Sequence, residues 1–340
     1  MRAALKRDFL ARAGWGGAAI SPLAGDASNR RYERAAMGGR RAVLMDAPAE
    51  RGEDIARFLA FTAWLRDLGL SAPEVFAAEA DAGFALIEDL GDALFARAAA
   101  ARPELEEELY AAAVDLLPRL ASPPASVSWA GAPAPVEPYD HAVLEREAML
   151  ALDWWAKGAG AAPSADLAAE YAGLIRAACA DVADARDHLA LRDYHAENLI
   201  WLPERRGDAR VGLLDYQDAL AGHAAYDLVS LLEDARRDTS AALREAMIAR
   251  HLRASDMDAE GFRAAYAALG AQRNLKIVGI FARLRLRDGK PQYLDLIPRV
   301  WAHLARDLAH PRLAPLADFV RRRIPAPDAA ALARVKGAGR

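Results

Sequence analysis

The stretch Leu191-Arg-Asp193-Tyr-His-Ala-Glu-Asn198 decides how this chain is interpreted. Apolar residues follow it at 199–202, turn residues occupy 203–208, and a second apolar run at 211–214 ends directly before Asp215. This pattern indicates a loop followed by a hairpin. A hairpin that begins after Asn198 and ends before Asp215 brings these two residues to the same end. The spacing therefore predicts a site that contains Asn198, Asp215 and the loop.

The residue types at this site favour phosphoryl transfer. Asn198 and Asp215 offer oxygen atoms, the ligands that Mg²⁺ prefers when it bridges nucleotide phosphates. Asp193, five residues before Asn198, can accept a proton from a substrate hydroxyl as that hydroxyl attacks the terminal phosphate. In the competing interpretation, the three polar side chains only cap and turn the backbone.

The chain upstream of this site predicts a small sheet with one helix. Apolar runs separated by turn residues indicate three strands at 20–23, 30–35 and 42–45, and Gly38-Gly39 marks the second turn. Apolar residues at three- and four-residue spacing indicate a helix from about residue 53 to 68. Two further strands are expected at 75–78 and 84–88. The order is three strands, one helix, two strands.

Most of the remaining chain has helical patterning. Residues 122–138 hold five prolines and predict a loop, and the tail from residue 324 is expected to be loosely held. Helices are expected at 141–155, at 165–186 and, apart from short turns, over 226–308. We therefore predict an α+β chain with two lobes. An N-terminal lobe that contains the sheet spans 1–90, and a helical lobe spans 93–340 and holds loop 191–198 and Asp215.

Composition excludes several classes of protein. The 340 residues carry 44 Lys and Arg against 48 Asp and Glu, a balance that argues against nucleic acid as the main partner. The basic run at residues 321–323 is short and is interpreted as solvated charge. Cys179 is the only cysteine, so no disulfide can form within the chain. No signal peptide or membrane-length apolar run is evident, so we expect a cytoplasmic protein with no membrane partner and no obligate protein partner.

The motifs resemble the aminoglycoside phosphotransferase superfamily, which has a bilobal, protein-kinase-like fold with a five-stranded antiparallel N-terminal sheet. The resemblance rests on residues 193–198, on Leu213-Leu-Asp215-Tyr-Gln-Asp218 and on Gly222-His-Ala-Ala-Tyr-Asp227-Leu. Within it, the chain is most similar to bacterial kinases that phosphorylate the anomeric hydroxyl of N-acetylmuramate and N-acetylglucosamine. The narrower likeness rests on residues 25–32, 43–48, 215–238, 274–284 and 287–290.

The resemblance implies an enzyme that uses ATP and Mg²⁺ and takes a small sugar as substrate. By position, Asp193 is the catalytic base, and Asn198 and Asp215 are the metal ligands. The resemblance also implies that lobe 1–90 binds the nucleotide. A loop over the ATP phosphates is implied at residues 25–30, and a hinge is implied at 88–92, in which residues 88–90 hydrogen-bond adenine. The cofactor-binding residues are therefore expected to be Gly25, Ser28, Asn29, Arg30, Glu88 and Leu90.

One departure puts phosphate anchoring in doubt. Kinases of this type carry a Lys at the end of the third strand, where this chain has Met45. Arg30, Arg31, Arg40 and Arg41 lie close enough in sequence to supply the charge, and Arg30 or Arg31 is favoured because both lie at the phosphate loop. The same departure leaves open a nucleotide-binding pseudokinase.

Several other residues have two interpretations each. His195 is expected to orient its neighbours, and Asp227 either caps a helix or supports the catalytic loop from a buried position. Arg283 and Arg287 share a helix face that either meets the lactyl carboxylate of a muramyl sugar or is solvated. A kinase of another small alcohol, such as an aminoglycoside, choline or a homoserine-like compound, would share every catalytic residue. The charge of its substrate pocket would separate these cases.

Overall fold

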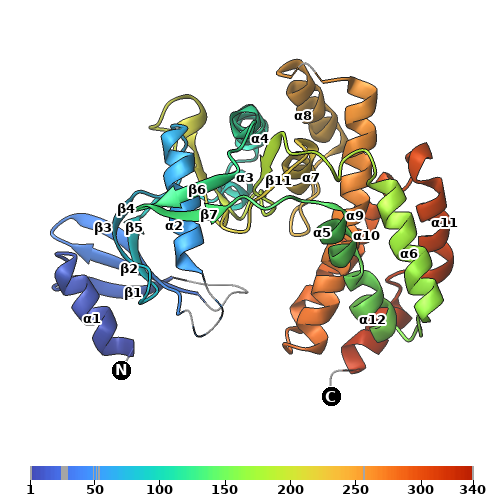
Figure 1. Ribbon diagram of the computed structural model, residues 1–340, viewed down its shortest axis with the longest axis horizontal. Helices are drawn as coiled ribbons and strands as arrows, with labels where there is room; N and C mark the ends of the chain where they lie inside the picture. Colours follow the sequence, from blue (N-terminus) through green and yellow to red (C-terminus); the bar gives the residue numbers. More distant parts are fainter. Residues whose placement is uncertain are drawn as a thin grey trace. The chain divides into compact units, whose positions relative to one another are not determined.

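The strands predicted upstream of residue 90 form one antiparallel sheet in the computed structural model, which describes residues 2–23, 30–48, 50, 52, 54–255 and 257–338. The strand order is β1-β2-β3-β5-β4 (Figure 1). Strand β5 therefore pairs with β3, and β4 lies at the edge of the sheet. This confirms the predicted order of three strands, one helix and two strands. The strands are β1 (Ala19–Leu23), β2 (Arg31–Met37), β3 (Arg40–Asp46), β4 (Val75–Glu79) and β5 (Phe84–Glu88).

A helix that was not predicted covers part of this sheet. Helix α1 (Arg2–Arg12) buries Phe9 and Leu10 against a cluster that includes Phe84 and Leu86 of β5. The Arg2 guanidinium forms a 2.6 Å ion pair with Asp46 at the end of β3. Charged residues occur throughout α1, and only Phe9 and Leu10 are buried, so its sequence shows a weak apolar periodicity.

Helix α2 (Ile55–Asp67) lies between β3 and β4 in the chain, as predicted. Its N-cap is Asp54, whose side chain accepts a hydrogen bond from the Arg57 backbone N–H at 3.1 Å. The expected start at residue 53 falls outside the described residues. Most of its apolar residues are buried, among them Phe58, Leu59 and Phe61. The pattern of three- and four-residue spacing therefore identified a packed helix correctly.

The turn between β4 and β5 yields a stability prediction at Gly83. This residue has φ +68°, and an added Cβ would lie 2.2 Å from the Ala47 carbonyl oxygen. We expect Gly83→Ala to lower the free energy of unfolding by about 2 kcal/mol. Gly38→Ala is the matched control, because Gly38 also has positive φ but has open space around its Cβ, and it should cost about 1 kcal/mol. Urea unfolding measures both, and equal losses would show that the carbonyl contact is unimportant.

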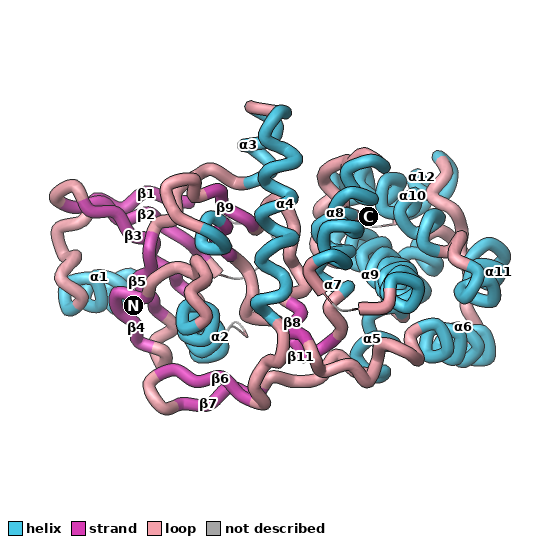
Figure 2. The backbone as a smooth tube through the Cα atoms, turned by 90° about the horizontal axis from the view of Figure 1, so that it is seen from above, coloured by secondary structure: helices cyan, strands magenta, loops and turns pink. Residues whose placement is uncertain are grey.

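The loop predicted at 122–138 contains a hairpin, so that prediction was wrong in part. Strands β6 (Ser126–Trp129) and β7 (Ala132–Pro135) pair through a turn in which Ala130 and Gly131 both have positive φ, as a type I′ turn requires. The prolines of β7 are tolerated because a two-stranded ribbon leaves every second backbone N–H unpaired. The hairpin packs beside α2 (Figure 2).

The contacts within the chain divide it into two compact units. The first comprises residues 1–113, 124–136 and 197–218, and the second comprises 114–123, 137–196 and 219–340. The second unit is mainly helical. The helices after residue 94 are α3 (Phe95–Ala101), α4 (Glu106–Leu116), α5 (His141–Ala148), α6 (Ala165–Ala178), α7 (Ala225–Leu232), α8 (Ala241–Arg253), α9 (Ala259–Leu286), α10 (Ile297–Asp307), α11 (Ala314–Arg323) and α12 (Ala329–Gly337).

Two short strand pairs flank the loop that the sequence analysis singled out. In the second unit, β8 (His188–Ala190) pairs with β11 (Leu220–Gly222). In the first unit, β9 (Leu199–Trp201) pairs with β10 (Val211–Leu213). Loop 191–198 joins β8 to β9. The hairpin predicted after Asn198 is therefore confirmed.

The C-terminal tail was expected to be loosely held, and this was wrong. Ile324 is buried, and α12 buries Ala331 and Val335 completely. Trp155, in a single turn of π-helix at Ala151–Ala156, donates a hydrogen bond from its indole to the Pro325 carbonyl at 2.8 Å. Two prolines near residue 326 had suggested an unstructured end. Across the described part of the chain, no helix is both long and apolar enough to cross a membrane.

Candidate active site

Loop 191–198 begins with a strained turn directly before Asp193. Arg192 has φ +74°, and the Asp193 N–H donates a hydrogen bond to the Leu191 carbonyl at 2.9 Å. This is a γ-turn with positive φ, a rare conformation for a side chain of this size. Such strain persists only where the surroundings hold the backbone in place. Asp193 therefore follows a backbone turn whose shape other residues must maintain.

Asp227 of α7 supplies much of that support. Its buried carboxylate accepts hydrogen bonds from the backbone N–H groups of Leu191, at 2.7 Å, and of Arg192, at 2.9 Å. Burial raises the pKa of Asp227 to about 7, while the two N–H donors favour its ionised form. Of the two interpretations given for Asp227, these contacts match the buried support.

A second contact holds the same residue, Arg192, at its carbonyl. The Ser230 hydroxyl donates to the Arg192 carbonyl at 3.1 Å, and Arg273 of α9 donates to the Ser230 oxygen at 2.8 Å. The backbone of Arg192 is therefore held at both its N–H and its carbonyl. These contacts explain how a positive φ is maintained beside the proposed base.

Asn198 and Asp215 lie at the same end of the β9–β10 hairpin. Leu199 pairs with Leu213, and the Leu214 N–H donates to the Asn198 carbonyl at 3.0 Å. Asp215 has φ +57°, and the Gln217 side-chain amide donates to its carboxylate at 2.8 Å. The hairpin thus brings these two predicted residues together.

The donor atoms of this pair fit Mg²⁺. A carboxylate and an amide offer hard oxygen ligands, and Mg²⁺ takes few protein ligands because it keeps waters and binds substrate phosphates. Among the described residues, there is no cluster of three or more His, Cys, Asp or Glu side chains that could hold a metal ion. Asp193 belongs to the second compact unit, whereas Asn198 and Asp215 belong to the first.

His195 is buried within the same loop. Burial lowers the pKa of its imidazole, while the charges of Asp234 and Asp193 act in the opposite direction. The Asp234 side chain accepts a hydrogen bond from the Arg236 N–H at 2.8 Å. A neutral, buried imidazole is suited to positioning the loop, the role expected for His195.

The residues predicted to contact the nucleotide are described only in part. Gly25, Ser28 and Asn29 lie outside the described residues, and Arg30 is partly exposed at the start of the described segment. Met45 is fully buried in β3, where it pairs with Tyr32 and with Ala85. The position that usually holds a Lys is thus an apolar core position here.

The segment after β5 is held by side chains that the sequence analysis did not single out. Arg34 of β2 forms ion pairs with Asp89, at 2.7 Å, and with Asp92, at 3.0 Å. The Glu88 carboxylate pairs with Arg205 and accepts a hydrogen bond from the Glu74 N–H at 3.2 Å. These contacts define the surroundings of the predicted hinge, and Leu90 within it is buried. Adenine binding by Glu88 and Leu90 stays a prediction.

The two arginines proposed to meet a sugar carboxylate lie at the end of α9. Arg287 forms a 2.7 Å ion pair with the neighbouring Asp288 and is largely exposed. Burial lowers the pKa of Arg283, which is partly covered. Neither side chain lines the cavity described next, and their role in substrate binding stays a prediction.

A cavity of about 340 Å³ lies within the second unit. It is lined mainly by the segment before α5, by α5 itself and by Arg192 of loop 191–198. Its charged lining residues are Glu137, Asp140, Arg146, Glu147 and Arg192. Arg192 is the residue directly before Asp193, so the cavity reaches the loop that carries the proposed base.

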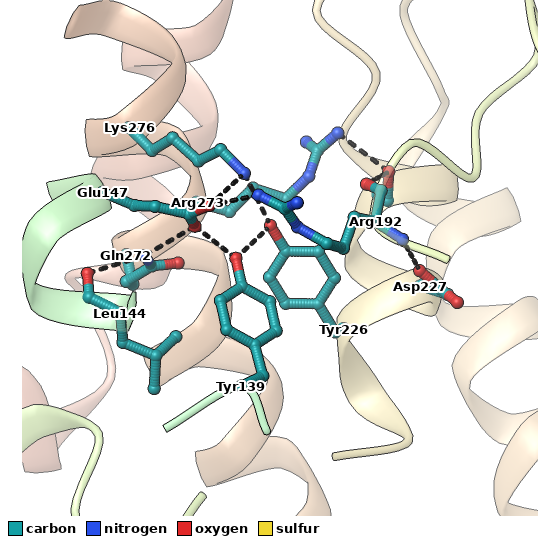
Figure 3. A network of polar contacts seen from close by, with 10 residues as sticks. Tyr139, Leu144, Glu147, Arg192, Tyr226, Asp227, Gln272, Arg273 and Lys276 are labelled. Carbon is teal, nitrogen blue, oxygen red and sulfur yellow. Dashed lines mark hydrogen bonds and ion pairs between the residues drawn. The ribbon is translucent and has the colours of Figure 1, made fainter. Parts of the chain in front are cut away.

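Two of the lining residues, Glu147 and Arg192, belong to a buried polar network (Figure 3). The Glu147 carboxylate pairs with Arg192 and, at 3.0 Å, with Lys276 of α9. Tyr139 donates a hydrogen bond to the same carboxylate, and its hydroxyl lies 2.8 Å from that of Tyr226. Burial alone would raise the pKa of Glu147, but the charges of Lys276 and Arg192 lower it to about 2. Glu147 is therefore ionised at neutral pH.

Sequence reasoning missed this network almost entirely. Its members come from five separate segments, and no local spacing links Tyr139, Glu147 and Lys276. One signal in the sequence could have indicated it. Glu147 occupies a position of α5 where the helical pattern expects an apolar residue, and an ionisable side chain buried there requires a partner.

Comparison with known proteins places these features in a family. The model of the Phosphotransferase enzyme family matches residues 19–266. The N-acetylmuramate/N-acetylglucosamine kinase of Caulobacter vibrioides is 41% identical, and the alignment covers 95% of this chain and 97% of that protein. The kinase of the same name from Pseudomonas aeruginosa is 32% identical, with 90% of each chain covered.

Solved structures with similar folds are more distant in sequence. An ADP-bound aminoglycoside phosphotransferase superposes with a TM-score of 0.61 at 13% identity, covering 90% of this chain and 99% of that one. A choline/ethanolamine kinase family protein from Mesorhizobium loti gives a TM-score of 0.59 at 16% identity, covering 99% of both chains. These similarities support the bilobal, kinase-like α+β fold that the sequence predicted.

Proposed function

Because the chain belongs to the phosphotransferase enzyme family, we propose that it is an ATP-dependent kinase that phosphorylates the anomeric hydroxyl of N-acetylmuramate and N-acetylglucosamine. The observation that carries the proposal is the Asp193-to-Asn198 loop and its hairpin to Asp215, in a chain similar over its length to kinases named for these sugars. Such an enzyme would act in cell-wall sugar recycling, in the cytoplasm, where ATP is available.

In the proposed reaction, the sugar O1 forms a bond to the γ-phosphorus of ATP. The bond between that phosphorus and the β,γ-bridging oxygen breaks, and ADP leaves with the electron pair. The Asp193 carboxylate accepts the proton of the anomeric hydroxyl. The products are a sugar 1-phosphate and ADP.

The remaining residues position these groups. Asn198 and Asp215 would hold Mg²⁺, which neutralises charge on the phosphates when bound. Asp227 and Ser230 hold the backbone that precedes Asp193. Because the transition state of phosphoryl transfer is loose, positioning and charge compensation supply most of the rate enhancement.

Phosphorus NMR of product mixtures tests this function. The purified protein is incubated with Mg²⁺, ATP and, separately, N-acetylmuramate, N-acetylglucosamine, glucose, an aminoglycoside and choline. We expect new sugar 1-phosphate signals with the two N-acetylated amino sugars only. A phosphorylated aminoglycoside or choline would assign the chain to another substrate, and ATP binding without any product would favour the pseudokinase.

A further inference from the structure

We propose that the cavity beside Arg192 holds the acceptor sugar and that Arg146 selects the acidic sugar by pairing with its carboxylate. This inference rests on the proposed function, since N-acetylmuramate carries a lactyl carboxylate that N-acetylglucosamine lacks. It assigns the recognition of that carboxylate to α5, at a different position from Arg283 and Arg287.

The position of the cavity supports its use by the acceptor. All of its lining residues belong to one compact unit, so its shape does not depend on the other unit. Arg192 lines it and is followed directly by Asp193, the proposed base. A volume of about 340 Å³ lies at the small end of the usual range for ligand sites and suits a single sugar ring.

The lining holds three carboxylates and two arginines, so the preference for a neutral or acidic sugar over a polycation rests on which of these charges are already paired. The buried Glu147 is already paired with two cations, Arg192 and Lys276, so it offers little attraction to an amine (Figure 3). The Asp140 side chain accepts a hydrogen bond from the Val143 N–H and caps α5. Glu137 is exposed at the rim and can accept hydrogen bonds from sugar hydroxyls.

Arg146 is the lining cation available to a ligand. Its neighbour in the cavity, Arg192, is committed to Glu147, whereas within the described chain Arg146 has no hydrogen bond or ion pair. It lies in the last turn of α5 and is exposed. A guanidinium can bind a carboxylate through two parallel hydrogen bonds, which gives geometry as well as charge.

Steady-state kinetics on both sugars test this assignment. We expect Arg146→Ala to raise KM for N-acetylmuramate about tenfold, the size of one charge-assisted contact at an exposed site, and to leave KM for N-acetylglucosamine within twofold. Arg146→Lys should recover part of the loss in KM, because it restores the positive charge but cannot form the two parallel hydrogen bonds of a guanidinium. Arg253→Ala, an exposed arginine at the end of α8, is the matched control and should change neither constant.

The outcomes separate this inference from the function on which it rests. If the wild-type protein phosphorylates both sugars and Arg146→Ala affects them equally or not at all, the assignment of Arg146 is wrong and the function stands. If the wild-type protein phosphorylates neither sugar, the proposed function is overturned, and this inference falls with it. A selective loss on N-acetylmuramate that grows weaker at high salt supports the ion pair.

Discussion

Replacing Asp193 by Asn is expected to lower kcat for sugar phosphorylation by about 10³-fold, within the range that a positioned general base contributes. The amide keeps the size of the side chain but cannot accept the hydroxyl proton. KM for ATP should change little, because the proposed nucleotide contacts involve other residues. Initial rates of ADP release with saturating sugar measure the effect.

The control for this experiment is Asp184→Asn, which removes an exposed carboxylate from the same compact unit. It should retain the wild-type rate. Thermal unfolding of both variants shows whether the fold is intact, and Asp193→Asn should unfold within a few degrees of the wild type. An Asp193→Asn enzyme that keeps more than a tenth of the wild-type kcat would exclude Asp193 as the base.

The hairpin between Asn198 and Asp215 could be predicted from the sequence because its signals are local. Apolar runs and turn residues on both sides of Asn198 and Asp215 specify the hairpin, and the hairpin specifies that these two residues meet. The strained turn at Arg192 gave no such signal, since nothing in its type indicates positive φ. It depends on Asp227, which lies 35 residues further along the chain.

Other features escaped prediction because tertiary packing decides them. The charged helix α1 is stabilised because Phe9 packs against the sheet. The local sequence pattern does not reveal this tertiary contact. The prolines of β7 suggested a loop, but Gly131 completes a turn that pairs the strand despite them. A carboxylate on a helix is usually solvated. The burial of Glu147 follows from the packing of α9, which brings Lys276 to 3.0 Å from its carboxylate.

Glu147→Gln is expected to lower the free energy of unfolding by about 3 kcal/mol at pH 7. The substitution leaves Arg192 and Lys276 in a buried site without their carboxylate, and breaking such a pair typically costs this much or more. The second variant, Glu147→Gln with Lys276→Met, should recover part of the loss because it removes one of the two uncompensated cations. Urea unfolding at pH 7 measures both. A loss below 1 kcal/mol would mean that water or a rearranged side chain compensates the cations.

The pH dependence of stability provides an independent test of the same site. The pKa of Glu147 is about 2 in the folded protein and near its ordinary value of 4.5 in the unfolded chain, so the unfolded state binds more protons between these values. Stability from this group is therefore complete above about pH 5 and is lost as the pH falls toward 2. The difference corresponds to about 3 kcal/mol, in agreement with the cost expected for Glu147→Gln.

The variant and the wild type should therefore converge in acid. Their free energies of unfolding should differ by about 3 kcal/mol at pH 7 and approach each other as the pH falls from 5 toward 3, because protonation removes the same charge that the substitution removes. A difference that stays constant over this range would show that Glu147 contributes through packing alone. Because Arg146 has no contact in this network, Arg146→Ala should leave the free energy of unfolding unchanged at every pH. The two substitutions therefore separate recognition of the sugar by Arg146 from the stability that the Glu147 network provides.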